Sequence, residues 1–121
     1  MKKILIVEDH ADIRRLIRMT LELDDYEILE AENGDIGLQM AIEHQPDLVL
    51  LDVMMPGSRN GLEVCQALQA RANPPRVLLL TARGRSEDLD AGMQAGAQAY
   101  LVKPFSPLQL INTINAQLEN V

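Results

Sequence analysis

The chain has 121 residues, of which 47% are hydrophobic, and its 11 basic and 18 acidic side chains give a net charge of -7. This length fits one globular domain, and the acidic balance disfavours general electrostatic attraction to nucleic acid or to an anionic membrane. One cysteine excludes an internal disulfide, and the sequence has neither a membrane-length apolar run nor a signal-peptide pattern, so we expect a soluble, cytoplasmic protein.

Apolar segments alternate with segments of helical spacing along the whole chain. In chain order, residues 4–7, 26–31, 48–51, 77–80 and 100–102 are predicted to form strands. Four of these are continuous apolar runs, typical of parallel strands covered on both faces, whereas the more weakly alternating 26–31 predicts an edge strand.

Helices are predicted after each strand. The apolar residues with helical spacing are Ile13, Leu16, Ile17 and Leu21, then Ile36 and Met40, then Leu62, Cys65 and Leu68, and finally Leu108, Ile111, Ile114 and Leu118. Further helix starts are indicated by Asn33-Gly34, by Ser86 as an N-cap candidate, and by Ser106 as a cap before Pro107. The pattern predicts one α/β domain over residues 1–121, a five-stranded parallel sheet doubly wound with five helices.

Polar residues follow four of the predicted strands. Strand one is followed by Glu8 and Asp9, strand three by Asp52, strand four by Thr81 and strand five by Lys103. Ligands of open α/β sheets bind beyond the carboxyl ends of the strands, and these ends share one edge, so we expect two or three carboxylates, a hydroxyl and an ammonium to meet there.

Such a group of acids requires positive charge. Two carboxylates 4 Å apart repel by about 4 kcal/mol at an effective dielectric constant near 20. Lys103 offsets one charge. The remaining acids are suited to Mg²⁺, which is typically bound by one or two carboxylates together with water molecules and a phosphate oxygen. An aspartate can accept a phosphoryl group covalently, so the residues predict a phosphoryl-accepting site with Mg²⁺, Lys103 and Thr81 around Asp52.

Each of these residues also has an ordinary structural explanation. An acid after strand one can interact favourably with the dipole of the following helix, and Asp52 can be a solvated loop residue. Thr81 can cap a turn, and Lys103 can form a structural ion pair. Their joint position at four strand ends favours the functional interpretation.

Several other polar residues are given no role in the site. His10 and His44 lack matching ligand spacing, and we interpret them as solvated loop residues. The basic residues of the first helix are interpreted as a solvated face, with partner docking as the alternative, and these are Arg14, Arg15 and Arg18.

Four motifs resemble the receiver domain of bacterial two-component response regulators: KILIVEDH, PDLVLLDVMMPG, LLLTA and YLVKPF, in this order. The resemblance covers essentially the entire chain. It implies the CheY-like, flavodoxin-like strand order 2-1-3-4-5, which sets strands one and three side by side and brings Asp9 next to Asp52.

The resemblance also implies roles for the site residues. Asp52 corresponds to the phosphoacceptor, Asp9 and Asp52 to direct Mg²⁺ ligands, and Glu8 to an acid acting through water. Met54 would add its main-chain carbonyl as a metal ligand, and Lys103 would bind the phosphoryl group.

A conformational switch is implied as well. Thr81 corresponds to the switch hydroxyl and Tyr100 to the aromatic ring that moves inward, which alters the surface of the fourth helix, fifth strand and fifth helix. Lys103-Pro104 is expected to be a cis peptide bond, an isomer found at about 5% of bonds before proline.

Two features depart from the family pattern. Four residues, GSRN, separate Pro56 from Gly61 where the family usually has three. The last helix, LQLINTINAQLE, lacks the basic residues that the winged-helix transcription-factor subfamily uses for symmetric dimers, which argues against that mode.

The leading interpretation is a signalling switch of a two-component phosphorelay, a phosphoprotein that forms an aspartyl phosphate. It would take its phosphoryl group from a histidine kinase or phosphotransfer protein and act on a downstream output domain or protein, without turnover of external substrates, nucleic-acid binding or membrane insertion. One alternative is a Mg²⁺-dependent aspartyl-phosphate hydrolase of small substrates, which would need a substrate lid. Others are a pseudo-receiver that binds partners unphosphorylated, and a flavin or nucleotide module, which would need a phosphate loop in place of EDHADI.

Overall fold

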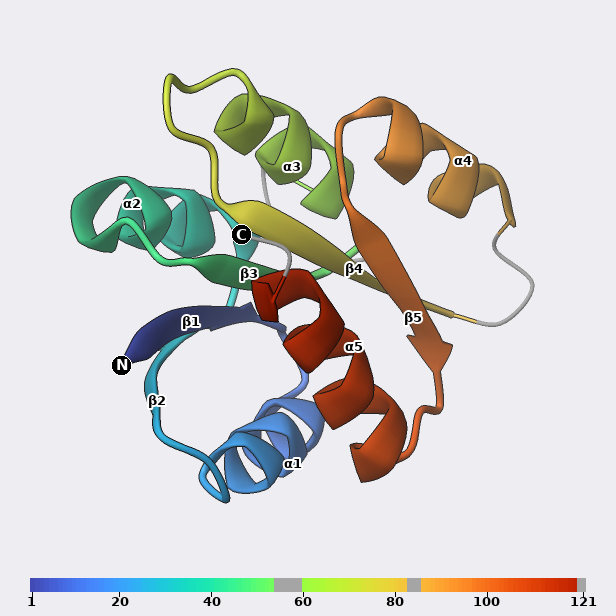
Figure 1. Ribbon diagram of the computed structural model, residues 1–121. Coiled ribbons are helices and arrows are strands. Elements are labelled where there is room, and N and C mark those ends of the chain that lie inside the picture. The colour runs from blue at the N-terminus through green and yellow to red at the C-terminus, as the bar shows by residue number, and fades with distance from the viewer. Residues whose placement is uncertain (54–59, 83–85, 120–121) are drawn as a thin grey trace.

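The computed structural model describes residues 1–53, 60–82 and 86–119. Within these residues the chain alternates strictly between strands and helices (Figure 1). The strands are β1 (Lys2–Val7), β2 (Tyr26–Ala31), β3 (Leu48–Asp52), β4 (Arg76–Ala82) and β5 (Ala99–Lys103). The helices are α1 (Ala11–Leu21), α2 (Gly34–His44), α3 (Gly61–Gln69), α4 (Ser86–Gln94) and α5 (Pro107–Glu119).

The five strands form one parallel sheet in the order β2-β1-β3-β4-β5, which confirms the predicted fold and strand order. In Figure 1, α1 and α5 cover one face of the sheet, and α2, α3 and α4 cover the other. The order reverses between β1 and β3, so the loops after these two strands separate to opposite sides of the sheet and leave room for a ligand at their ends.

Each face of the sheet carries its own aliphatic core. Alternate residues of β1, β3 and β4 point to opposite faces, so Val7, Leu51 and Leu79 pack against α2 and α3 while Ile6, Leu50 and Leu80 pack against α1 and α5. Cys65 lies fully buried in the first of these cores, where burial raises the pKa of its thiol to about 11. Cys65 thus packs in the core, as its place on the apolar face of the third predicted helix indicates.

Most strands extend beyond the apolar runs that predicted them. β1 begins at Lys2, and β4 extends from Arg76 to Ala82, because ladder pairing continues through polar residues at the ends of a run. α4 begins at Ser86, the residue that the sequence suggests as its N-cap, and the capping side chain lies outside the described part of the chain.

Side chains fix the starts of three helices. Asn33 accepts a hydrogen bond from the Ile36 NH at the start of α2, and Asn60 forms a reciprocal capping box with Glu63 at the start of α3. Ser106 forms the same arrangement with Gln109 before α5, as predicted. None of the helices in the described part of the chain has the length and apolar character needed to cross a bilayer.

The edge strand β2 is tied to the opposite end of the chain. The Tyr26 hydroxyl donates a hydrogen bond of 3.0 Å to Asn115 Oδ1 on α5. This contact joins residues that are 89 positions apart and holds the last helix against the sheet.

Candidate functional site

Two neighbouring strands bring their acids to the same edge of the sheet. Val7 pairs with Leu51 in the β1–β3 register, so Glu8, which follows β1, and Asp52, which ends β3, lie at the same level. The Glu8 NH continues the ladder by donating to the Ala31 carbonyl. Both carboxyl groups are buried, with Glu8 at 0% and Asp52 at 3% exposure, so the topology places these charges where water cannot solvate them fully.

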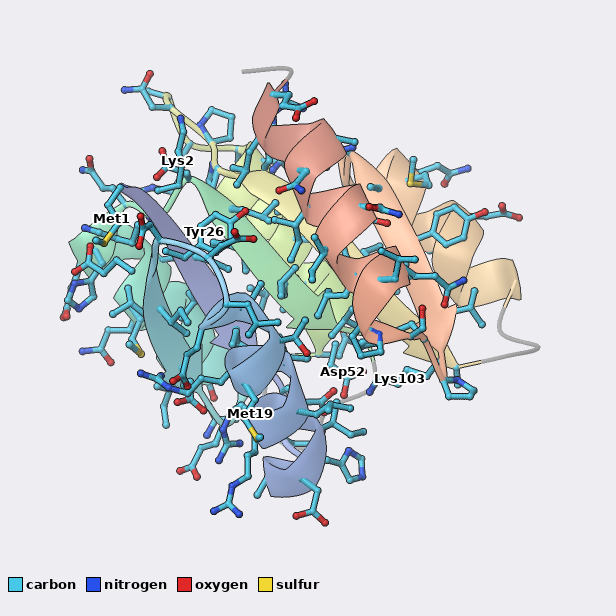
Figure 2. All side chains as sticks on the ribbon, turned by 60° about the horizontal axis from the view of Figure 1, so that its bottom comes forward. Met1, Lys2, Met19, Tyr26, Asp52 and Lys103 are labelled. Carbon is cyan, nitrogen blue, oxygen red and sulfur yellow. The ribbon has the colours of Figure 1, made fainter. Side chains whose placement is uncertain are left out.

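Lys103 supplies the positive charge at this edge. Its Nζ lies 2.7 Å from Glu8 Oε1 and 3.5 Å from Asp52 Oδ1. Figure 2 shows Asp52 and Lys103 close together beyond the ends of the central strands. The Lys103-Pro104 peptide bond is cis, as expected from the sequence.

The ionisation of Glu8 depends on these neighbours. Burial alone would raise the pKa of Glu8, because it removes the carboxylate from water. The Lys103 ammonium, a hydrogen bond with Asp52 and the main-chain NH of His10 outweigh burial and lower the pKa of Glu8 to about 2. Glu8 is therefore a fixed negative charge at neutral pH.

The acids converge closely enough to hold a metal ion. Ligand atoms of Glu8, Asp9, His10 and Asp52 all lie within 4.8 Å of one another. Three carboxylates are the oxygen donors that Mg²⁺ prefers, and Lys103 offsets only one of their charges. The donor set thus fits the magnesium site that the sequence predicts.

His10 belongs to this cluster although the sequence analysis gave it no role. Its Nδ1 lies 3.3 Å from Glu8 Oε2 and 3.3 Å from Asp9 Oδ1. The pattern that could have revealed it is the run Glu8-Asp9-His10, three consecutive residues of metal-binding type directly after a strand.

Arg14 holds the segment that carries these acids. Its Nη1 donates a 2.8 Å hydrogen bond to the Glu8 carbonyl, and its Nε lies 3.2 Å from Glu30 Oε1 on β2. Arg18 binds the other oxygen of the same Glu30 at 2.7 Å. The interpretation of Arg14 as part of a solvated face is therefore wrong, because the register of β2 places Glu30 within its reach.

The start of α3 is pinned against the end of β3. The Gly61 NH donates to the Val53 carbonyl at 3.2 Å, and the Val53 NH donates to the Leu80 carbonyl at 3.0 Å. A Cβ at position 61 would overlap the main-chain oxygen of Asp52, so only glycine allows this close approach.

Thr81 and Tyr100 lie on the two strands at the other side of the site. Thr81 is 3% exposed near the end of β4, and its hydroxyl lies 3.5 Å from the Ala82 carbonyl. Tyr100 on β5 is 44% exposed and pairs with Leu79 in the β4–β5 register. Met54, expected to supply a main-chain carbonyl, and the first three residues of the GSRN loop lie outside the described residues.

Comparison with known proteins assigns the family. A model of the response regulator receiver domain matches residues 4–115. The transcriptional regulatory protein ResD of Bacillus subtilis is 46% identical over 116 residues, which are 96% of this chain and 48% of ResD. The phosphate regulon transcriptional regulatory protein PhoB of Pseudomonas aeruginosa is 40% identical over 120 residues, 97% of this chain and 52% of PhoB.

Solved structures agree with this assignment. A putative response regulator from Chloroflexus aurantiacus has a TM-score of 0.92 at 31% identity, covering 98% of both chains. The chemotaxis protein CheY4 of Vibrio cholerae has a TM-score of 0.86 at 33% identity, covering 96% of this chain and 98% of CheY4.

The chain belongs to the response regulator receiver domain family of two-component systems. It spans about half the length of the curated relatives described above.

Proposed function

We propose that Asp52 accepts a phosphoryl group from the phosphohistidine of a sensor kinase or phosphotransfer protein. A carboxylate oxygen of Asp52 forms a new P–O bond while the donor's P–N bond breaks, and the imidazole leaves with a proton. The single observation that carries this proposal is the convergence of Glu8, Asp9, Asp52 and Lys103 at one edge of the sheet. Phosphoryl transfer needs mainly positioning and charge neutralisation, which this group provides.

Mg²⁺ held by Glu8, Asp9 and Asp52, and by the Met54 carbonyl, would neutralise charge between these acids and the phosphoryl oxygens. Lys103 already contacts Asp52 Oδ1 at 3.5 Å, so its ammonium can bind a phosphoryl oxygen there with little movement. Thr81 lies one residue before the end of β4, at the same edge, and would offer its hydroxyl to another phosphoryl oxygen. In this proposal Asp52, Thr81 and Lys103 form the phosphorylation site.

The switch would run from Thr81 to Tyr100. Their strands are paired, and parallel register sets Leu79 opposite Tyr100 and Thr81 opposite Val102, so both residues belong to the same face of the sheet. Drawing the Thr81 hydroxyl toward the phosphoryl group would open space for the Tyr100 ring to move inward. The surface of α4, β5 and α5 would change as a result, and a partner that distinguishes the two states would read the change.

The phosphodonor is proposed to dock beside the site. A mostly apolar cavity of about 340 Å³, lined by Ile13, Leu16, Lys103, Pro104 and Phe105, lies between α1 and the segment after β5. Leu16 is 49% exposed, so α1 offers apolar contact area next to the lysine of the site.

We further propose that residues 1–121 form one receiver domain that works in the cytoplasm and does not turn over external substrates. The output, whether a further domain or a separate protein, is proposed to carry any nucleic-acid binding. Two of the relatives are regulators of transcription, by their names.

The test is incubation with acetyl phosphate and Mg²⁺, followed by intact mass measurement. We expect one phosphate adduct that hydroxylamine removes, and we expect none with EDTA or in Asp52→Asn. An adduct of equal yield in Asp52→Asn would refute the assignment. Steady release of phosphate from small phosphate esters would favour the hydrolase instead, and partner binding without any adduct would favour the pseudo-receiver.

A further inference from the structure

His10 lies at the mouth of the acidic cluster, directly before α1. Its main-chain NH donates to Glu8 Oε2 at 3.2 Å, and its side chain is 65% exposed. The ring is therefore accessible from solvent on one side and faces the buried Glu8 and the partly buried Asp9 on the other.

One ring nitrogen approaches two different acids at the same distance. Nδ1 lies 3.3 Å from Glu8 Oε2 and 3.3 Å from Asp9 Oδ1. Ligand atoms on adjacent vertices around a metal ion lie about 3.0 Å apart in octahedral and about 3.4 Å apart in tetrahedral coordination. The nitrogen thus lies from each of the two oxygens at the distance found between neighbouring ligands of one ion.

The charge of the cluster favours a divalent ion at this point. Lys103 contacts Glu8 through Oε1, the oxygen away from His10, so Oε2 faces the imidazole. When all three carboxyl groups are ionised, Lys103 offsets one charge and leaves two. A divalent cation between Oε2, Asp9 and the imidazole would complete this balance.

The nature of the donors determines which ion gains most from His10. Mg²⁺ prefers oxygen ligands and gains little from an imidazole. First-row transition ions such as Mn²⁺, Co²⁺ and Zn²⁺ bind imidazole nitrogen well, and their affinities exceed those of Mg²⁺ at mixed nitrogen and oxygen sites.

We propose that His10 is a nitrogen ligand that makes this site selective for a divalent first-row transition ion over Mg²⁺. The inference rests on the metal site of the proposed function, and deepens it by naming the residue that sets metal preference. His44, the second of the two histidines, ends α2 and is not part of the metal cluster found among the described residues, so it serves as a matched control.

The direct test is pulsed EPR of protein loaded with Mn²⁺ and labelled with ¹⁵N-histidine. We expect echo modulation from one coordinated histidine nitrogen in the wild type and in His44→Ala, and we expect its loss in His10→Ala. A histidine coupling that persists in His10→Ala, or that is absent from the Mn²⁺-loaded wild type, would overturn the proposal.

A second measurement compares two metals on the same proteins by calorimetry. In His10→Ala we expect the affinity for Co²⁺, relative to Mg²⁺, to fall by about tenfold or more, the scale on which even outer-shell partners affect metal binding. An unchanged ratio would show that His10 acts only as an ion-pair partner of the acids. Mg²⁺-dependent phosphorylation of Asp52 is measured in a separate experiment. If His10 proves not to bind the metal, the phosphorylation of Asp52 is unaffected by that result. If an adduct is retained in Asp52→Asn, the EPR evidence for His10 is likewise unaffected.

Discussion

The ammonium of Lys103 lies 2.7 Å from a carboxylate oxygen of Glu8, a fully buried residue 95 positions earlier in the chain. Removing one partner of a buried ion pair costs about 3–5 kcal/mol, because the other charge stays buried without compensation. We therefore expect Lys103→Met to lower the free energy of unfolding by about 3 kcal/mol in EDTA, measured by urea denaturation. Lys3→Met is the control, since the Lys3 ammonium makes only surface contacts, a pair with the exposed Glu27 at 3.9 Å and an exposed hydrogen bond to the His44 carbonyl at 2.9 Å, and surface ion pairs contribute about 1 kcal/mol or less. Equal losses in the two variants would contradict this account of the pair.

The lowered pKa of Glu8 predicts how acid affects the metal-free protein. The pKa is about 2 in the folded state against an ordinary value of 4.5, so the folded state binds this proton less readily than the unfolded state. The resulting stability is present above pH 4.5 and is lost as the pH falls toward 2, by about 3 kcal/mol in total. As the pH is lowered over this range, we expect the urea midpoint of unfolding to fall less steeply in Glu8→Gln than in the wild type. Parallel curves would show that other carboxyl groups govern the acid transition.

Arg14 is predicted to position the acids without contacting the metal. Because its guanidinium binds the Glu8 carbonyl, Arg14→Ala should loosen the segment that carries Glu8 and Asp9. We expect Mg²⁺ affinity, measured by calorimetry, to fall about tenfold, as for other outer-shell residues. Arg18→Ala is the matched control, since the Arg18 guanidinium pairs with Glu30 and Glu22 and, among the described residues, does not bond to either acid of the segment. A similar loss in both variants would assign the effect to Glu30 instead.

Gly61 is predicted to be irreplaceable by alanine. The added Cβ would overlap the main-chain oxygen of Asp52, and neither backbone can move without displacing β3 or α3. Overpacking costs about 1–3 kcal/mol, so we expect Gly61→Ala to lose at least that much stability and to slow the labelling of Asp52 by acetyl phosphate. Gly92→Ala gives the comparison, because the new Cβ there meets the terminal methyl of Leu79, which can change rotamer, and alanine favours the helix. A loss of unfolding free energy in Gly92→Ala as large as that in Gly61→Ala, measured by urea denaturation, would count against this interpretation.

The sequence predicted the sheet well because four of the five strand cores are continuous apolar runs. The β3 run was found to within one residue, and only Asp52 was added, because pairing with Leu80 extends the ladder past the apolar residues. Residues such as Lys2 and Arg76 could not be assigned to strands from polarity, since their membership depends on a neighbouring strand.

The arrangement of the site was predictable where topology alone determines it. Glu8, Asp52 and Lys103 follow or end parallel strands, and parallel strands must share an edge, so their meeting follows from the order of elements. The contacts of His10 and Arg14 were missed because they depend on the direction of the turn before α1 and on the position of Glu30 in β2. The spacing of residues along the sequence determines neither the direction of this turn nor the position of Glu30 relative to α1.

The chain has no tryptophan and two tyrosines, and the fold gives these two rings opposite surroundings. Tyr26 lies on β2 and is bound to α5 by its hydrogen bond to Asn115, while Tyr100 on β5 is 44% exposed. Ultraviolet emission from the folded chain therefore comes from one anchored and one solvent-facing phenol. In Tyr26→Phe, Tyr100 is the one remaining tyrosine. Quenching of its fluorescence by iodide then reports on the surroundings of Tyr100 alone, without an attached dye.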